Sequence, residues 1–188
     1  AVAYCSGGRV KLLSRSLEDV TARYPELRAM GEAIGAAEMI LDGEVIAVGP
    51  GGRPSFELLQ SRMGLTAEAD IRRRMKETPI GYVIFDILYL DGRSTLDLPY
   101  SERRELLEDL GLKGRFWQTP PSTTGDGEGT LEASRKLGLE GVMAQRTARP
   151  VAPGQGWDAR HQAKHPQLRD VVIPGCVPRP PTRRVTVG

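Results

Sequence analysis

The sequence predicts a single α+β domain, and three observations support this fold class. Segments typical of strands and of helices follow one another without the regular alternation that builds a parallel sheet. The chain has 188 residues, which is enough for one domain with a hydrophobic core. Hydrophobic residues make up 39% of the chain and charged residues 27%, an ordinary balance for a folded domain.

The first part of the chain predicts a hairpin, a helix and a long strand. Residues 1–5 and 9–13 flank a Ser-Gly-Gly turn at 6–8, which is typical of a β-hairpin. Residues 25–35 carry apolar side chains at helical spacing and end in a glycine, which predicts a helix. Residues 39–48 are apolar around an Asp-Gly-Glu centre and predict a strand that ends at a glycine-rich turn.

The second part is predicted to hold the most apolar strand. Residues 80–90 are almost entirely apolar apart from Asp86, and an Asp-Gly turn follows them. We expect Ser101 to cap a helix that runs to Leu110 and that Gly111 ends. The other expected elements are helices over 55–63, 67–76 and 129–137, strands over 141–144 and 170–173, and a surface loop over 147–160.

The composition narrows the function classes without choosing among them. Of 26 basic residues five are lysines and 21 are arginines; this bias suits phosphate recognition, but genomic base composition explains it equally well. No apolar run reaches the roughly 20 residues of a membrane span, and no signal peptide is visible. Cys5 and Cys176 lie far apart without metal-ligand spacing, which predicts buried thiols in a reducing compartment and a cytoplasmic location.

Five short motifs occur in a fixed order. They are LLSR (12–15), LDGE (41–44), FDILYLDG (85–92), LEGVMAQR (139–146) and KHPQLRDVVIPG (164–175). Together they resemble the nucleotidyltransferase (adenylation) domain of ATP-dependent DNA ligases, particularly the bacterial end-joining type. The resemblance covers residues 1–175 and implies two antiparallel sheets with packed helices that form a nucleotide cleft. The family's OB-fold domain is expected near residue 176 and is absent, so residues 176–188 are interpreted as a Pro/Arg-rich tail.

The family's nucleophile is a lysine in a K-x-D-G-x-R segment, which attacks the α-phosphate of ATP and carries AMP as a phosphoramide. The strand at Ala1 resembles the one that follows this segment. The resemblance therefore implies that the nucleophilic lysine lies upstream of Ala1 and that the 188 residues hold no catalytic residue.

The resemblance also implies roles for four residues. Arg15 matches an arginine that contacts the ribose and supports the phosphates, and Glu44 matches a glutamate that engages the ribose or the metal environment. Phe85 matches an aromatic that stacks on adenine. Glu140 matches the metal-site glutamate, a hard oxygen ligand of the kind that Mg²⁺ prefers. Taken alone, Arg15 is better interpreted as a solvated strand end and Phe85 as core. Glu44 taken alone is equally a site residue or a carboxylate with a structural partner, and the alternative for Glu140 is the end of a helix.

The last two motifs depart from the family's pattern. Gln145 occupies the place of a phosphate-binding lysine, and Gln162 the place of the first lysine in W-x-K-x-K, while Lys164 matches the second. A charge-assisted hydrogen bond contributes about 1.5–3 kcal/mol, so two such losses predict weak phosphate binding. With no nucleophile as well, we expect no self-adenylation.

Two functions remain open at this stage. One is a fragment or divergent member of the ATP-dependent DNA ligases, which seal nicks in DNA repair through an enzyme–AMP intermediate. The alternative is a non-catalytic ligase-like module that binds adenine nucleotide or DNA. By resemblance, the expected ligands are ATP or AMP, Mg²⁺ and nicked duplex DNA. We expect a monomer without membrane contact.

Overall fold

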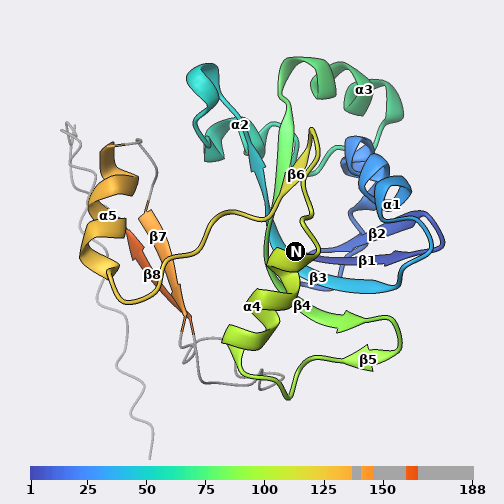
Figure 1. Cartoon of the computed structure of the whole chain (residues 1–188). Helices are drawn as coiled ribbons and strands as arrows, with labels where there is room; N and C mark the ends of the chain where they lie inside the picture. The colour runs from blue at the N-terminus through green and yellow to red at the C-terminus, as the bar shows by residue number, and fades with distance from the viewer. Residues whose placement is uncertain (137–140, 146–159, 165–188) are drawn as a thin grey trace, which may run out of the picture.

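One six-stranded sheet forms the centre of the molecule (Figure 1). The structure is a computed structural model that describes residues 1–136, 141–145 and 160–164. Neighbouring strands run antiparallel in the order β2-β1-β3-β4-β5, and β6 pairs with β4 in parallel. The strands are β1 (Val2–Ser6), β2 (Arg9–Leu13), β3 (Met39–Ala47), β4 (Ile80–Leu90), β5 (Arg93–Ser94) and β6 (Trp117–Gln118).

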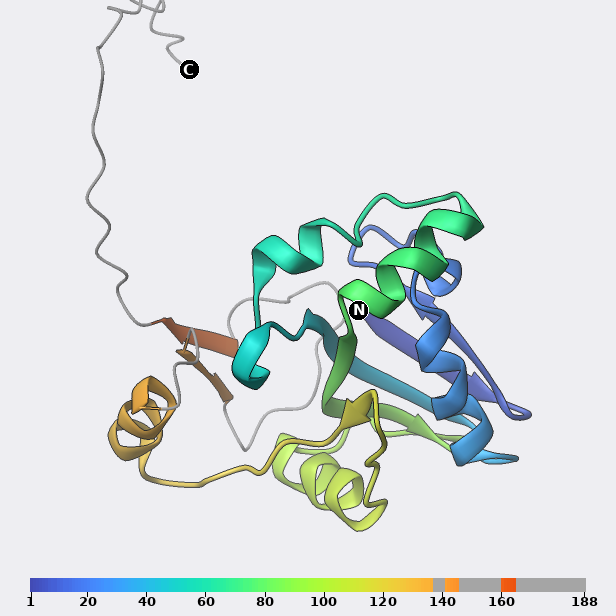
Figure 2. The same cartoon turned by 90° about the horizontal axis from the view of Figure 1, so that it is seen from above.

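Helices surround this sheet, and a second, two-stranded sheet lies beside it. The 3₁₀ turns are η1 (Thr21–Arg23), η2 (Pro25–Leu27) and η3 (Pro50–Gly52), and the α-helices are α1 (Arg28–Ile34), α2 (Phe56–Gln60), α3 (Glu68–Glu77), α4 (Tyr100–Asp109) and α5 (Gly127–Lys136). The antiparallel pair β7 (Gly141–Gln145) and β8 (Arg160–Lys164) packs with α5. In both views α5, β7 and β8 lie together at the left, and α1 with the β1–β2 hairpin lies at the right (Figures 1 and 2).

The hydrophobic core lies against one face of the six-stranded sheet. Successive side chains of a strand point to opposite faces, and in β3 the residues at 39, 41, 43, 45 and 47 are buried while those between them are half-buried or exposed. Helix α1 packs against β1 and β2, and α4 packs against β4. Their core contributions include Met30 and Leu107, which are completely buried.

Two ion pairs are enclosed in the fold. Arg62 has no exposed surface and binds Glu26 through both terminal nitrogens, at 2.8 and 3.1 Å. Arg103, on α4, binds Asp86 of β4 through Nε at 2.8 Å and Nη2 at 2.9 Å. Each guanidinium also donates to backbone carbonyls, which is the fork-shaped recognition for which arginine is suited. The Arg103–Asp86 pair ties α4 to the sheet, and the Arg62–Glu26 pair ties η2 to the segment between α2 and α3.

The α+β class is confirmed, and the strand over 80–90 has the predicted bounds. Several element boundaries differ from the prediction. The helix expected over 55–63 ends at Gln60, and the one expected over 129–137 begins at Gly127. Helix α4 begins at Tyr100, directly after Pro99, and no side chain caps it, so Ser101, the expected cap, lies inside the first turn. Proline's fixed φ angle and its inability to continue a helix backward place the boundary there. Strand β8 was not expected, because its sequence lacks an apolar pattern.

Several expectations concern residues outside the described part of the chain. These are the strand over 170–173, most of the loop over 147–160, Cys176 and the tail over 176–188. Cys5 is buried and free, as its apolar interpretation predicted. Among the described helices, none has the length and apolar character needed to cross a membrane.

Candidate nucleotide site

Three of the motifs meet at one end of the sheet. The register pairs Leu13 with Val2, Val2 with Asp42, and Asp42 with Asp86, so a single line of residues crosses four strands. Leu13 belongs to the first motif, Asp42 to the second and Asp86 to the third. Leu13 and Asp86, which are 73 residues apart in sequence, are thus brought onto one line by strand pairing.

The candidate residues lie within two positions of this line. Arg15 follows the end of β2, Glu44 pairs with Val83 across β3 and β4, and Phe85 adjoins Asp86 on β4. Two residues of a strand span about 7 Å, and β2 is two strand spacings, about 10 Å, from β3. The sheet thus arranges the three side chains as Phe85, Glu44 and Arg15, in that order across the strands.

Glu44 and Phe85 lie on the face of the sheet that does not carry the core. Glu44 is exposed, and Phe85 and Val83 are half-buried. Neither Phe85 nor Val83 belongs to the residues that pack against the core. A face with an aromatic ring, an aliphatic side chain and a carboxylate can take up a ligand that is apolar and flat at one part and hydroxylated at another.

Arg15 is presented by a tight turn after β2. The backbone N–H of Ser14 donates to the carbonyl of Glu18 at 2.9 Å, and that of Leu17 donates to Ser14 at 3.0 Å. Leu17 has a φ of 63°, which closes the turn and leaves its own side chain 77% exposed. The Arg15 side chain is exposed, and it is the positively charged residue of the first motif.

Gly43 permits the close packing that holds this end of the sheet together. A Cβ at position 43 would lie 2.4 Å from the carbonyl oxygen of Val83 and 2.7 Å from the Tyr82 ring. The Tyr82 hydroxyl donates to the carbonyl oxygens of Ala1 at 2.9 Å and Leu41 at 3.1 Å. Burial, and secondarily the Asp42 carboxylate, raises the pKa of Tyr82 well above its usual range, so the hydroxyl remains a donor.

The amino group of Ala1 lies at the same place. It donates to the carbonyl oxygen of Gly43 at 2.7 Å, next to Glu44. Strand β1 runs between β2 and β3, so Ala1 is enclosed by paired strands and is not at a sheet edge. Motif matching alone did not reveal the contributions of Gly43 and Tyr82, because both depend on contacts across strands.

The last two motifs meet in the smaller sheet. Position 145 pairs with 160, 143 with 162, and 141 with 164, so Lys164 and both glutamines are brought onto one ladder. Glu140, the expected metal ligand, lies outside the described residues. In the described ranges there is no cluster of three His, Cys, Asp or Glu side chains that would hold a metal ion. The structure therefore brings Arg15, Glu44 and Phe85 together and leaves the metal site without a described ligand.

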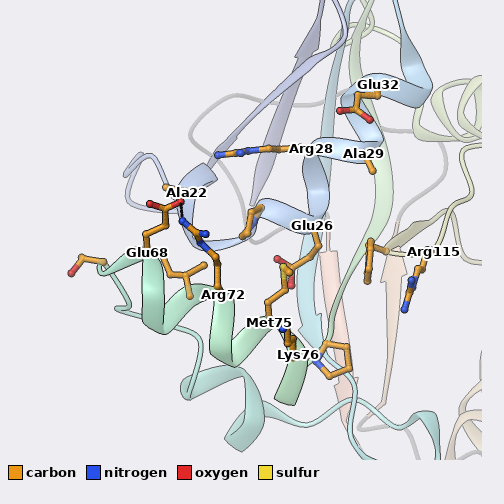
Figure 3. Close-up of a pocket in the computed structure, with 15 residues that line it drawn as sticks. Ala22, Glu26, Arg28, Ala29, Glu32, Glu68, Arg72, Met75, Lys76 and Arg115 are labelled. Atoms are coloured by element: carbon orange, nitrogen blue, oxygen red, sulfur yellow. Dashed lines mark hydrogen bonds and ion pairs between the residues drawn. The ribbon is translucent and has the colours of Figure 1, made fainter.

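A hollow of about 1130 Å³ lies elsewhere, between α1, α3 and the segment before β6 (Figure 3). Arg28 and Glu32 of α1 line it from one side, and Glu68 and Arg72 of α3 from another. Its charges are mixed in sign, and Glu68 and Arg72 bind each other. None of the three candidate residues lines this hollow, so the motifs and the hollow are separate features.

Comparison with known proteins connects this geometry to a family. Residues 1–158 match the family model of the ATP dependent DNA ligase domain. The chain is 38% identical over 168 residues to the multifunctional non-homologous end joining protein LigD of Mycobacterium bovis, covering 89% of the chain and 20% of that protein. It is 39% identical over 157 residues to a DNA ligase of Cenarchaeum symbiosum, covering 80% of the chain and 26% of that ligase.

A solved structure gives the same relationship in three dimensions. The mycobacterial DNA ligase D complexed with ATP and MES superposes with a TM-score of 0.73 at 36% identity, covering 87% of this chain and 50% of that one. The chain thus spans about a fifth of the full LigD protein and half of its solved ligase domain. By motif order, fold and sequence, the chain belongs to the family of ATP-dependent DNA ligases.

Proposed function

We propose that this chain forms the nucleotide-binding core of an ATP-dependent DNA ligase that acts in DNA end joining or repair. Adenine stacks on Phe85, the ribose lies by Glu44, and the phosphates extend toward Arg15. One observation carries this proposal: across β4, β3 and β2, the aromatic, the carboxylate and the arginine follow the order of base, sugar and phosphate in a nucleotide. We propose that the nucleotide cleft lies between the β7–β8 sheet and the face of the six-stranded sheet that carries Glu44 and Phe85.

Chemistry on the nucleotide is mainly a matter of position and charge. Adenylyl transfer needs an in-line nucleophile and cations that neutralise the phosphates and the leaving pyrophosphate. The family's lysine, expected upstream of Ala1, would enter beside Glu44 because Ala1 lies against Gly43. Glu140 would supply an oxygen ligand to Mg²⁺, which stabilises charge that develops on the phosphates.

Binding measurements with single substitutions test the assigned order. Phe85→Ala should weaken both adenosine and AMP by about tenfold, since a stacked base contributes about 1–3 kcal/mol. Arg15→Met should weaken AMP and leave adenosine unchanged. Tyr89→Ala is the control, because Tyr89 is a half-buried aromatic on the same strand to which the proposal assigns no contact with the nucleotide. Equal effects of Phe85→Ala and Tyr89→Ala would refute the adenine site.

The two glutamines test the phosphate end. ATP should bind about as tightly as AMP, and the double substitution Gln145→Lys with Gln162→Lys should raise ATP affinity by about tenfold or more. Titration calorimetry with both nucleotides measures this difference. An ATP affinity that the lysines leave unchanged would show that positions 145 and 162 do not serve the phosphates.

A covalent assay separates the ligase core from a working ligase. The five lysines of these 188 residues lie outside any K-x-D-G segment. Incubation of the 188-residue chain with labelled ATP and Mg²⁺, followed by a denaturing gel, should give no acid-labile adenylate. A label on any of the five lysines would contradict this expectation. The second candidate function, a non-catalytic module, would also bind nucleotide without forming a labelled adenylate. DNA ligation by the intact parent protein would exclude this second candidate.

A further inference from the structure

A β-bulge sets the backbone of Phe85. Asp42 pairs with Asp86, and the next residue of β3, Gly43, pairs with Ile84, so Phe85 is an additional residue with no partner in this register. Such a bulge bends a strand and redirects the side chain of the extra residue. The direction of the Phe85 ring therefore depends on whatever holds the bulge in place.

Among the described residues, no strand pairs with the other edge of β4 at this point. β6 pairs with β4 only at Tyr82 and Val83, and β5 only at Tyr89 and Leu90. Between them, the segment that leads into α4 supplies the donors instead of a strand. Thr95 donates to the carbonyls of Ile87 (Oγ1, 2.6 Å) and Leu88 (backbone N–H, 3.1 Å), and the Tyr100 hydroxyl donates to the carbonyl of Phe85 at 3.3 Å.

A buried ion pair holds the following residue. Asp86 is 1% exposed, and Arg103 grips both of its carboxylate oxygens while Asp86 Oδ1 also accepts the backbone N–H of Ile87 at 3.0 Å. Arg103 Nη1 donates to the carbonyl of Leu98 at 2.6 Å, and its guanidinium carbon lies 5.6 Å from the centre of the Tyr100 ring. The two α4 side chains thus support one another as well as the bulge.

Stability alone is a weak reason for such a pair. The desolvation of two buried charges usually offsets their attraction, so a well-packed apolar pair is often as stable. What the pair and the hydroxyl provide is a fixed backbone directly after the Phe85 Cα, because the Tyr100 hydroxyl holds the Phe85 carbonyl and Arg103 holds the side chain of Asp86.

We propose that Tyr100 and Arg103 are positioning residues for the Phe85 ring and thereby set the enzyme's affinity for the adenine base. This inference rests on the proposed function, in which Phe85 stacks on adenine. Neither residue belongs to the five motifs, and both lie near the start of α4, which packs against β4.

A double-mutant cycle on the 188-residue chain tests the inference, with calorimetric affinities for AMP and for ribose 5-phosphate, which lacks the base. Tyr100→Phe removes only the hydroxyl and should weaken AMP about fivefold, with little effect on ribose 5-phosphate. In the Phe85→Ala background, the same substitution should have no further effect on AMP, because the ring through which it acts is gone. Arg103→Lys keeps the positive charge but loses the two-nitrogen contact with Asp86. It should weaken AMP binding more than Tyr100→Phe does, again with no further effect in the Phe85→Ala background.

The control is Tyr89→Phe, which removes an exposed hydroxyl bonded to Glu38 Oε2 at 3.4 Å on the same strand and should not change AMP affinity. Thermal melting accompanies each variant, and Tyr100→Phe carries the test if Arg103→Lys does not fold. If Phe85→Ala weakens AMP but Tyr100→Phe does not, or if Tyr100→Phe acts equally in both backgrounds, the positioning role is refuted. If Phe85→Ala leaves AMP affinity unchanged, the proposed adenine site fails, and the positioning role fails with it.

Discussion

Removal of one partner of the buried Arg62–Glu26 pair should strongly destabilise the domain. Arg62 Nη1 also donates to the carbonyl of Thr78 at 2.8 Å, and Nη2 to the carbonyl of Arg23 at 2.9 Å. The guanidinium therefore joins η1 and η2 to the end of α3, which leads into β4. The substitution Arg62→Met leaves the Glu26 side chain, 2% exposed, without its cation and frees both carbonyls.

The expected cost follows from burial. A single charge left in the interior costs about 3–5 kcal/mol, because the ion has lost water and gained no partner. For a chain of this length, each kcal/mol lowers the melting temperature by about 2–4 °C, so Arg62→Met should melt about 6–20 °C lower. Glu26→Gln leaves the Arg62 guanidinium without its carboxylate, and its melting temperature should be lowered by a similar amount. Urea unfolding followed by circular dichroism gives the free energies directly.

A double variant and a variant of an exposed ion pair test the role of the buried Arg62–Glu26 pair. Combining Glu26→Leu with Arg62→Met should cost less than Arg62→Met alone, since no unpaired charge remains. Arg72→Met is the matched control, because Arg72 and Glu68 form an ion pair that is 68% and 79% exposed, and such pairs contribute about 0–1 kcal/mol. If Glu26→Gln cost as little as Arg72→Met, or if the double variant cost the sum of the two singles, the buried pair would not have the role assigned to it.

Three further predictions concern the sheet. Gly43→Ala should cost about 1–3 kcal/mol in urea unfolding, since its Cβ would lie 2.4 Å from a backbone oxygen, whereas Gly81→Ala, whose nearest neighbour would be 3.7 Å away, should be nearly neutral. Tyr82→Phe should cost about 1–3 kcal/mol by the same assay, because the carbonyls of Ala1 and Leu41 lose a donor. A loss of less than about 0.5 kcal/mol, the lower end of what one hydrogen bond contributes, would contradict this expectation. Burial raises the pKa of the Cys5 thiol from 9.0 to about 11, so the folded state keeps a proton that the unfolded state loses: stability should fall as pH rises from 9 to 11, and Cys5→Ala should lessen that slope.

Much of the fold could be predicted because its signals are local. The strand over 80–90 is a long apolar run between turn residues, and the structure gives it the same bounds. The hairpin over 1–13 was equally readable from its Ser-Gly-Gly turn. The proximity of Arg15, Glu44 and Phe85 was expected only from the order of the motifs, and the strand register now supplies its physical cause.

The interior charges could not be predicted from the sequence. Arg62, Arg103 and Asp86 belong to residue types that are mostly exposed, and their burial depends on partners 17 and 36 residues away. Nothing in the pattern of β4 marks Phe85 as an additional residue, because a bulge is defined by the partner strand. The strand over 160–164 was missed for a related reason: its pairing with β7 stabilises it, and its own residues do not favour a strand.

The internal place of β1 has a practical consequence for handling the protein. An affinity tag or a fluorescent fusion joined at Ala1 would emerge from between β2 and β3, against Gly43, and would occupy space next to the proposed nucleotide face. A label in the turn at Gly7 and Gly8 avoids this, because this turn lies at the far end of the hairpin. Immobilisation through that end would leave the proposed nucleotide face open to solution.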